Sequence, residues 1–81
     1  MAFSAELDRI TVDPGILGGK PSIRGMRLSV ERVLAVLAQN PSWDDLQADY
    51  PELEHEDIRQ VLAFAAALVA GRVQIRNATA A

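Results

Sequence analysis

The residues best suited to chemistry are three cations that follow a pair of glycines. Lys20, Arg24 and Arg27 come shortly after Gly18 and Gly19. Lysine and arginine bind phosphate oxygens, and glycine exposes backbone N–H groups that can approach a phosphate closely. The spacing therefore favours contact with a nucleic acid or with a protein partner. The alternative is structural: the glycines form turns, and the arginines pair with carboxylates that hold this loop on the helices.

The charge distribution suggests that residues of the following helix belong with these three cations. The chain carries five basic and two acidic residues between Arg9 and Arg32, but seven acidic residues and no lysine or arginine between Pro41 and Asp57. The first segment suits a polyanion, whereas the second repels one. If DNA is bound, we expect the contacts to come from the loop and the start of the first helix. The candidate DNA-binding residues are Lys20, Arg24, Arg27, Ser29 and Arg32.

The sequence contains no constellation typical of catalysis or of metal binding. His55 is the only histidine, and the glutamates on either side of it point in other directions on a helix. The serines lack a histidine partner, and the carboxylates between Asp44 and Glu52 come without a nucleophile or a phosphate-binding loop. The absence of cysteine excludes disulfides and thiolate metal sites. We therefore predict no catalytic residue, no metal and no cofactor, in a protein that is not an enzyme.

The composition indicates one small soluble domain. The chain has 81 residues, of which 49% are hydrophobic and 23% charged, which is ordinary for a globular protein. No run reaches the ~18 apolar residues of a membrane span, and the first nine residues lack the apolar core of a signal peptide. We therefore expect a cytoplasmic protein without a membrane partner. Because a domain of this size often gains a second core by pairing, we also expect a homodimer.

The elements that position these residues are expected in the order strand, hairpin and three helices. Arg9–Val12 alternates like a strand, and residues 22–24 and 27–28 read as two short strands around a bend. Ser29 and Ser42 are good N-caps, each followed by a helix that stops before a proline. The predicted fold is mainly α, with an N-terminal short strand and β-hairpin followed by a three-helix, helix-turn-helix-like bundle within residues 9–70.

The third helix is expected from Glu54 to Ala70, with a stop at Gly71. In a helix-turn-helix protein this would be the recognition helix, but three acids in its first turn oppose DNA by Coulomb repulsion. Only Arg59 and Gln60 offer a weak case for reading base edges. We therefore interpret this helix as core with an acidic surface. Its predicted core-facing stripe is Ile58, Val61, Leu62, Ala65, Leu68 and Val69.

The run from Gly18 to Val30 resembles domain-of-unknown-function family 433. That family carries a G-G-K-P-x-I-R-G-T-R stretch, preceded by an I-x-x-(D/N)-P segment that Ile10–Pro14 matches. A later D-Y-P element is matched by Asp49–Pro51, and the resemblance covers about residues 9–70. It implies a helix-turn-helix-like, homeodomain-like fold. It also implies an antitoxin of a type II toxin–antitoxin pair, which neutralises a PIN-like ribonuclease toxin by contact and can repress its own operon by binding operator DNA.

Two positions depart from the family pattern. Met26 stands where the family has threonine, so a hydroxyl role there is lost. Glu54 stands at the N-cap of the third helix, where threonine is usual and where glutamate caps less well. We therefore expect that helix to start differently or to be less firmly anchored.

Residues 71–81 form a C-terminal arm in this interpretation. Val73 and Ile75 alternate with polar neighbours, so the arm can add a strand to a partner or fray as an ordinary tail. The candidate partner-binding residues are Val73, Ile75 and Arg76. Two alternatives to the antitoxin stay open: a stand-alone DNA-binding transcriptional regulator, and a protein-interaction domain without a DNA function.

Overall fold

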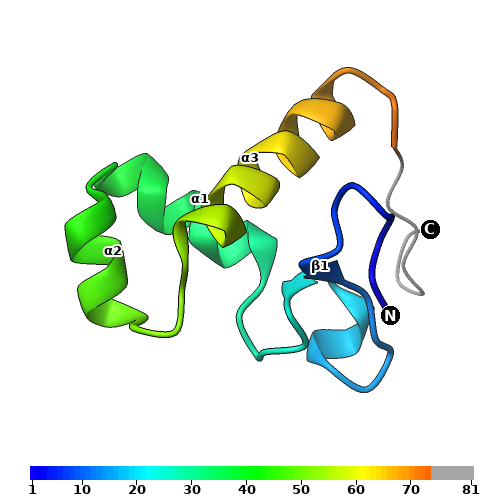
Figure 1. Ribbon diagram of the computed structural model, residues 1–81, viewed down its shortest axis with the longest axis horizontal. Helices are drawn as coiled ribbons and strands as arrows, with labels where there is room; N and C mark the ends of the chain where they lie inside the picture. Colours follow the sequence, from blue (N-terminus) through cyan, green and yellow to red (C-terminus); the bar gives the residue numbers. More distant parts are fainter. Residues whose placement is uncertain (74–81) are drawn as a thin grey trace.

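The computed structural model describes residues 1–73, in which three helices are joined by short turns. The elements are β1 (Ile10–Thr11), the 3-10 turn η1 (Leu17–Gly19), β2 (Ser22–Ile23), α1 (Val30–Gln39), α2 (Trp43–Asp49) and α3 (His55–Val69). Figure 1 shows α2 at one end of the molecule and β1 with its loops at the other, with α1 and α3 between them. The predicted mainly α fold, with a short N-terminal strand and hairpin before three helices, is confirmed.

Capping residues set the helix boundaries where the sequence predicted them. The Ser29 hydroxyl accepts a hydrogen bond from the Arg32 N–H at 2.9 Å, and the Ser42 hydroxyl accepts one from the Asp45 N–H at 3.2 Å. Each hydroxyl satisfies an N–H group that has no partner within the first turn of its helix. Both helices end two residues before a proline, because the residue before proline avoids the helical region.

Helix α3 ends at the predicted glycine in a Schellman motif. Gly71 adopts a left-handed conformation with φ 74°. The Gly71 N–H donates to the Leu68 carbonyl at 3.0 Å, and the Arg72 N–H donates to the Ala67 carbonyl at 2.9 Å. These two bonds satisfy carbonyls that the last turn of a helix otherwise leaves without a partner.

The strands are shorter than the alternating sequence indicates. β1 and β2 form an antiparallel pair in which Ile10 lies opposite Ile23. The predicted strand over residues 9–12 contracts to two residues, because the chain turns away at Asp13 and Pro14. The small sheet thus serves mainly to bring two buried isoleucines together.

The second arm of the predicted hairpin, residues 27–28, closes a tight turn instead of forming a strand. The Ile23 N–H donates to the Leu28 carbonyl at 3.1 Å across this turn. Arg24 and Gly25 make the bend with φ 48° and 71°. Glycine adopts this left-handed region easily and arginine does not, so Arg24 needs other interactions to hold it there.

The core lies where α1 and α3 meet the strand pair and the segment before α3. Phe64 of α3 is buried, and the ring of Phe3 packs edge-on against it with 4.9 Å between ring centroids. The buried hydrophobic residues are Ile10, Ile23, Leu28, Val30, Val33, Leu46, Leu53, Val61 and Phe64. Within residues 1–73, no helix combines the length and the apolar character that crossing a membrane requires.

The buried face of α3 corrects the predicted stripe. Leu62 and Val69 were expected in the core but are 52% and 90% exposed, whereas Asp57, Gln60 and Phe64 are buried. The segment from Gln60 to Gly71 has no charged side chain, so hydrophobic periodicity does not define one face. Hydrogen bonds to the N-terminal segment decide which side of the helix turns inward.

Candidate functional site

The predicted cation Arg24, although partly exposed, is paired with a buried carboxylate. Its Nε donates to Asp57 Oδ1 at 3.0 Å and its Nη2 to Asp57 Oδ2 at 2.9 Å, which is a bidentate pair. Nη2 also donates to the Glu52 carbonyl at 2.7 Å. The structural alternative, in which an arginine of this loop pairs with the acidic segment, is therefore confirmed for Arg24. This pair also holds Arg24 in its left-handed backbone conformation.

A second arginine completes this cluster, which we call the arginine clamp and define as Arg9, Arg24, Glu54 and Asp57. Arg9 Nη1 donates to Asp57 Oδ1 at 3.1 Å and to Glu54 Oε1 at 2.6 Å. The clamp thus joins three segments that are distant in sequence: the residue before β1, the turn after β2 and the first turn of α3. Its function in the fold is to fix the start of α3 against the N-terminal half.

Asp57 stays ionised in this environment. Burial alone raises the pKa of the Asp57 carboxyl, but the hydrogen bonds from Arg24, from the Glu54 backbone N–H and from Arg9 outweigh it, so the pKa is lowered. Every hydrogen-bonding side-chain atom that is buried within residues 1–73 has a partner. The clamp is therefore a satisfied ion cluster around one buried carboxylate and not a vacant binding site.

The start of α3 is held by Asp57, which bears on the prediction that Glu54 caps this helix weakly. The Glu54 N–H donates to Asp57 Oδ2 at 2.9 Å, the reciprocal bond of a capping box, and α3 begins at His55 directly after it. The glutamate is held in turn by Arg9. Asp57 within the helix and Arg9, the residue before β1, both hold this first turn. Weaker anchoring of this helix stays a prediction.

The base-reading candidates on α3 are engaged within the molecule. Gln60 is buried; its Oε1 accepts from the Arg9 N–H at 2.9 Å, and its Nε2 donates to Asp8 and Glu56. Arg59 donates to both carboxylate oxygens of Glu56 at 2.8 and 2.7 Å. Hydrogen bonds from Arg59 and then Gln60 lower the pKa of Glu56 to about 2. The buried Gln60 is not available to read a base, and Arg59 has a competing carboxylate.

The other predicted DNA-binding residues gather around the N-terminus of α1. Lys20, Ser29 and Arg32 line one shallow hollow of about 270 Å³, together with Glu31 and Ala35. Lys20 Nζ pairs with Glu31 Oε1 at 3.3 Å, and both side chains are largely exposed. Ser29 caps the helix. Arg27 and Arg32 are exposed and have no ion-pair partner among residues 1–73. We call Lys20, Glu31 and Arg32 the rim.

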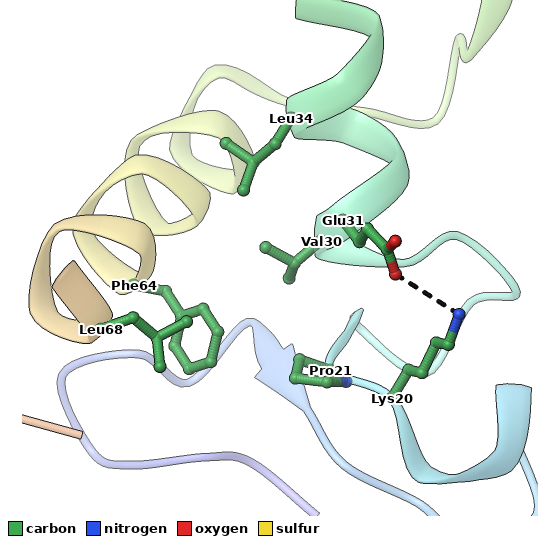
Figure 2. Close-up of a pocket in the computed structure, with 7 residues that line it drawn as sticks. All are labelled: Lys20, Pro21, Val30, Glu31, Leu34, Phe64 and Leu68. Atoms are coloured by element: carbon green, nitrogen blue, oxygen red, sulfur yellow. Dashed lines mark hydrogen bonds and ion pairs between the residues drawn. The ribbon is translucent and has the colours of Figure 1, made fainter. Parts of the chain in front are cut away.

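Next to the rim lies an apolar pocket of about 290 Å³ between α1 and α3. Figure 2 shows the apolar wall on these two helices and on Pro21 of the preceding loop, with the Lys20–Glu31 ion pair at one side. The wall is formed by Pro21, Val30, Leu34, Phe64 and Leu68. The sequence did not predict this pocket, because its depth depends on how far apart two helices pack. Leu34 and Leu68 show only the helical periodicity of ordinary core residues.

The remaining predicted positions have different surroundings. Val73 is partly buried and packs against the core, while Ile75 and Arg76 lie outside the described residues. Met26 is also partly buried against the core. The ring of His55 lies 4.1 Å, centroid to centroid, from that of Trp43. Among residues 1–73, histidines and acids do not form a group of three or more that is placed to hold a metal ion.

A family model described as "Protein of unknown function (DUF433)" matches residues 10–65. The chain belongs to this family. The DUF433 region runs from β1 into α3 and contains both Arg24 and Asp57, so the bidentate pair of the clamp lies wholly within it. Lys20, Arg32 and most of the pocket wall also fall inside the DUF433 region.

One similar protein is "Uncharacterized protein y4eO" of Sinorhizobium fredii. It is 36% identical over 65 residues, which cover 80% of this chain but 29% of the relative. The chain therefore spans less than a third of that protein's length. No solved structure matches the chain significantly.

Proposed function

We propose that this chain is an antitoxin-like binding protein that neutralises a PIN-like ribonuclease toxin by direct contact. The observation that carries the proposal is the apolar pocket between α1 and α3, bordered by the charged rim. A concave apolar surface with a few polar groups at its edge suits the side chain of a protein partner. The toxin itself follows from the family resemblance alone.

The distribution of charge favours a protein over DNA as the first partner. Arg24, one of the two arginines of the motif, is held by Asp57 in a bidentate pair. The first turn of α3 is acidic, and Gln60 is buried. The carboxylates of this turn are paired with Arg9, Arg24 and Arg59, so the start of α3 offers no excess of positive charge to the phosphates of a duplex. Lys20 and Arg32 beside the pocket suit a partner side chain that is apolar and flanked by acids.

A second candidate function is a stand-alone transcriptional regulator. Lys20, Ser29 and Arg32 lie around one hollow at the N-terminus of α1, where cations and a hydroxyl can contact phosphates. Operator binding can also accompany toxin binding in one protein. In either case we propose a cytoplasmic homodimer without enzymatic activity. A protein-interaction domain without a DNA function is the remaining alternative.

The test is a pull-down of the tagged full chain from its own cell extract, at low and at high salt. Both the bound protein and the bound DNA are identified. Binding through about 6–10 phosphate contacts releases counterions and weakens by about 10³–10⁵-fold between about 50 and about 200 mM salt, whereas an apolar anchor persists. A stoichiometric PIN-like ribonuclease that survives high salt supports the antitoxin. Promoter DNA without such a protein supports the regulator, and recovery of neither contradicts both.

A further inference from the structure

The apolar pocket and the shallow hollow beside it share two lining residues. Val30 and Leu34 of α1 line the pocket, Arg32 lines the hollow, and Lys20 and Glu31 line both. Figure 2 shows the Lys20–Glu31 ion pair at the edge of the apolar wall. The boundary between an apolar cavity and a charged one is therefore an ion pair and not a packed apolar side chain.

This boundary pair is easier to open than the arginine clamp. Lys20 Nζ makes one contact with Glu31 Oε1 at 3.3 Å, and the two side chains are 57% and 77% exposed. In the clamp, Arg24 binds the fully buried Asp57 through two hydrogen bonds. Because water solvates both Lys20 and Glu31, Lys20 can change its partner without leaving a buried charge unpaired.

The rim carries one positive charge more than its own carboxylate matches. Lys20 and Arg32 are its cations, and Glu31 is the single acid among the described residues that line the two cavities. Arg32 is exposed and has no ion-pair partner within residues 1–73. One further carboxylate would give each cation an anion, so the charge of the rim suits an acidic group that lies beside an apolar one.

We propose that the pocket and the rim form one site for a partner segment with a large apolar side chain and a nearby carboxylate, and that Glu31 competes with this carboxylate for Lys20. The apolar side chain enters the pocket against Leu34 and Phe64. The carboxylate displaces Glu31 from Lys20 Nζ and lies near Arg32. Glu31 thereby acts as an internal competitor and sets how tightly an acidic partner binds. This assignment rests on the proposed function, because it specifies the chemistry of the partner at the same surface.

The first test uses two small probes that share an apolar group and differ in charge, 4-phenylbutyrate and its neutral amide. Each probe is titrated into the isotope-labelled full chain, and the backbone amide resonances are followed by NMR. Ligands of this size bind roughly in the millimolar range. Both probes are expected to shift the resonances of Val30, Leu34 and Leu68, which line the pocket. The carboxylate should bind about 3-fold more tightly than the amide, because Lys20 and Arg32 attract it.

Three variants isolate the competition at Lys20. Glu31→Gln removes the competing charge and should strengthen the binding of 4-phenylbutyrate by about 3-fold while leaving that of the amide unchanged. Lys20→Gln should reduce the preference for the carboxylate. Glu52→Gln removes an exposed carboxylate that lines neither cavity and should bind both probes like the wild type. This control has the same net charge as Glu31→Gln, so it separates local competition from the charge of the whole chain.

Two results of the titrations overturn the assignment. Equal binding of the two probes by the wild type excludes the carboxylate site, as does the absence of shifts at the pocket residues. Equal binding of 4-phenylbutyrate by Glu31→Gln and Glu52→Gln excludes competition by Glu31.

A pull-down from the native extract, eluted with increasing salt, separates this assignment from the proposed function. Glu31→Gln should release the PIN-like ribonuclease at higher salt than the wild type and Glu52→Gln, and Lys20→Gln should release it at lower salt. If Leu34→Glu loses the ribonuclease while Glu31→Gln and Glu52→Gln elute together, the pocket is supported and the competition is overturned. If no ribonuclease is retained but the probes bind as expected, the toxin is wrong and the site for an apolar group with a carboxylate is supported.

Discussion

Arg24 and Lys20 lie four residues apart in one motif, and each pairs with a carboxylate, yet the two pairs differ in their surroundings. The partner of Arg24 is Asp57, which is completely buried, and the arginine binds it with two parallel hydrogen bonds. The partner of Lys20 is Glu31, whose side chain is 77% exposed. An ion pair in water contributes little to folding, whereas a buried carboxylate that loses its cation is costly. The same motif thus supplies a clamp that holds the fold and a rim that faces solvent.

The largest effect is expected for removal of the carboxylate at the centre of the clamp. Asp57→Ala leaves Arg9 and Arg24 without their shared anion and removes the bond to the Glu54 N–H. We expect a loss of about 3–5 kcal/mol in the free energy of unfolding, measured by urea denaturation. Asp49→Ala, an exposed acid on α2, is the matched control and should stay within about 0.5 kcal/mol of the wild type. Similar losses for both variants contradict the clamp.

Arg24→Ala should have the next largest effect. The side chain is 35% exposed, so solvent screens part of the interaction, and we expect a loss of about 1–3 kcal/mol. Arg24→Lys keeps the charge but cannot form the bidentate pair, and it should recover only part of the stability. Arg27→Ala removes an exposed arginine from the same turn and should be neutral in the same urea experiment. If Arg27→Ala matches Arg24→Ala, general charge rather than the clamp explains the loss.

The pH dependence of the stability tests the clamp through Asp57. The pKa of Asp57 in the folded chain is lowered from the unfolded value of about 3.9. The stability that this group contributes is therefore complete above about pH 4 and is lost as the pH falls through the folded pKa. Urea denaturation between about pH 7 and pH 3 should show this loss in the wild type. Asp57→Asn should show a shallower acid dependence, and an unchanged dependence would exclude Asp57 as its source.

Lys20→Ala is expected to have the smallest effect on folding. The Lys20–Glu31 pair is solvent-exposed and contributes about 0–0.5 kcal/mol. Thermal unfolding should therefore give a melting temperature close to that of the wild type. A loss of stability as large as that of Arg24→Ala would contradict the difference proposed between the clamp and the rim.

Much of the fold could be predicted because local chemistry fixes it. Ser29 and Ser42 cap their helices, prolines end them, and Gly71 closes α3, so these helix boundaries depend on residues within one or two turns. The face that α3 buries could not be predicted in this way. The apolar residues of α3 lie on all sides of the helix. Hydrogen bonds from Arg9, about fifty positions away, hold Asp57 and Gln60 on its inner side.

The candidate site shows the same division between local and distant determinants. The sequence identified the cations of the motif and offered both a binding and a structural interpretation for them. Only the fold reveals that Arg24 reaches a buried carboxylate while Lys20 and Arg32 border a hollow. The pocket depends on the spacing of α1 and α3. Phe64, which lines the pocket and packs against Phe3, has no sequence signal beyond being aromatic in an apolar helix.

The most direct test of the account is the retention of a PIN-like ribonuclease by a variant of the pocket wall. Leu34→Glu places a charge in the pocket and leaves the clamp intact, while Ala48→Glu adds the same charge on exposed α2. In a high-salt pull-down from the native extract, we expect the wild type and Ala48→Glu to retain the ribonuclease and Leu34→Glu, folded by circular dichroism, to lose it. Equal retention by Leu34→Glu and Ala48→Glu would contradict the pocket as the binding surface.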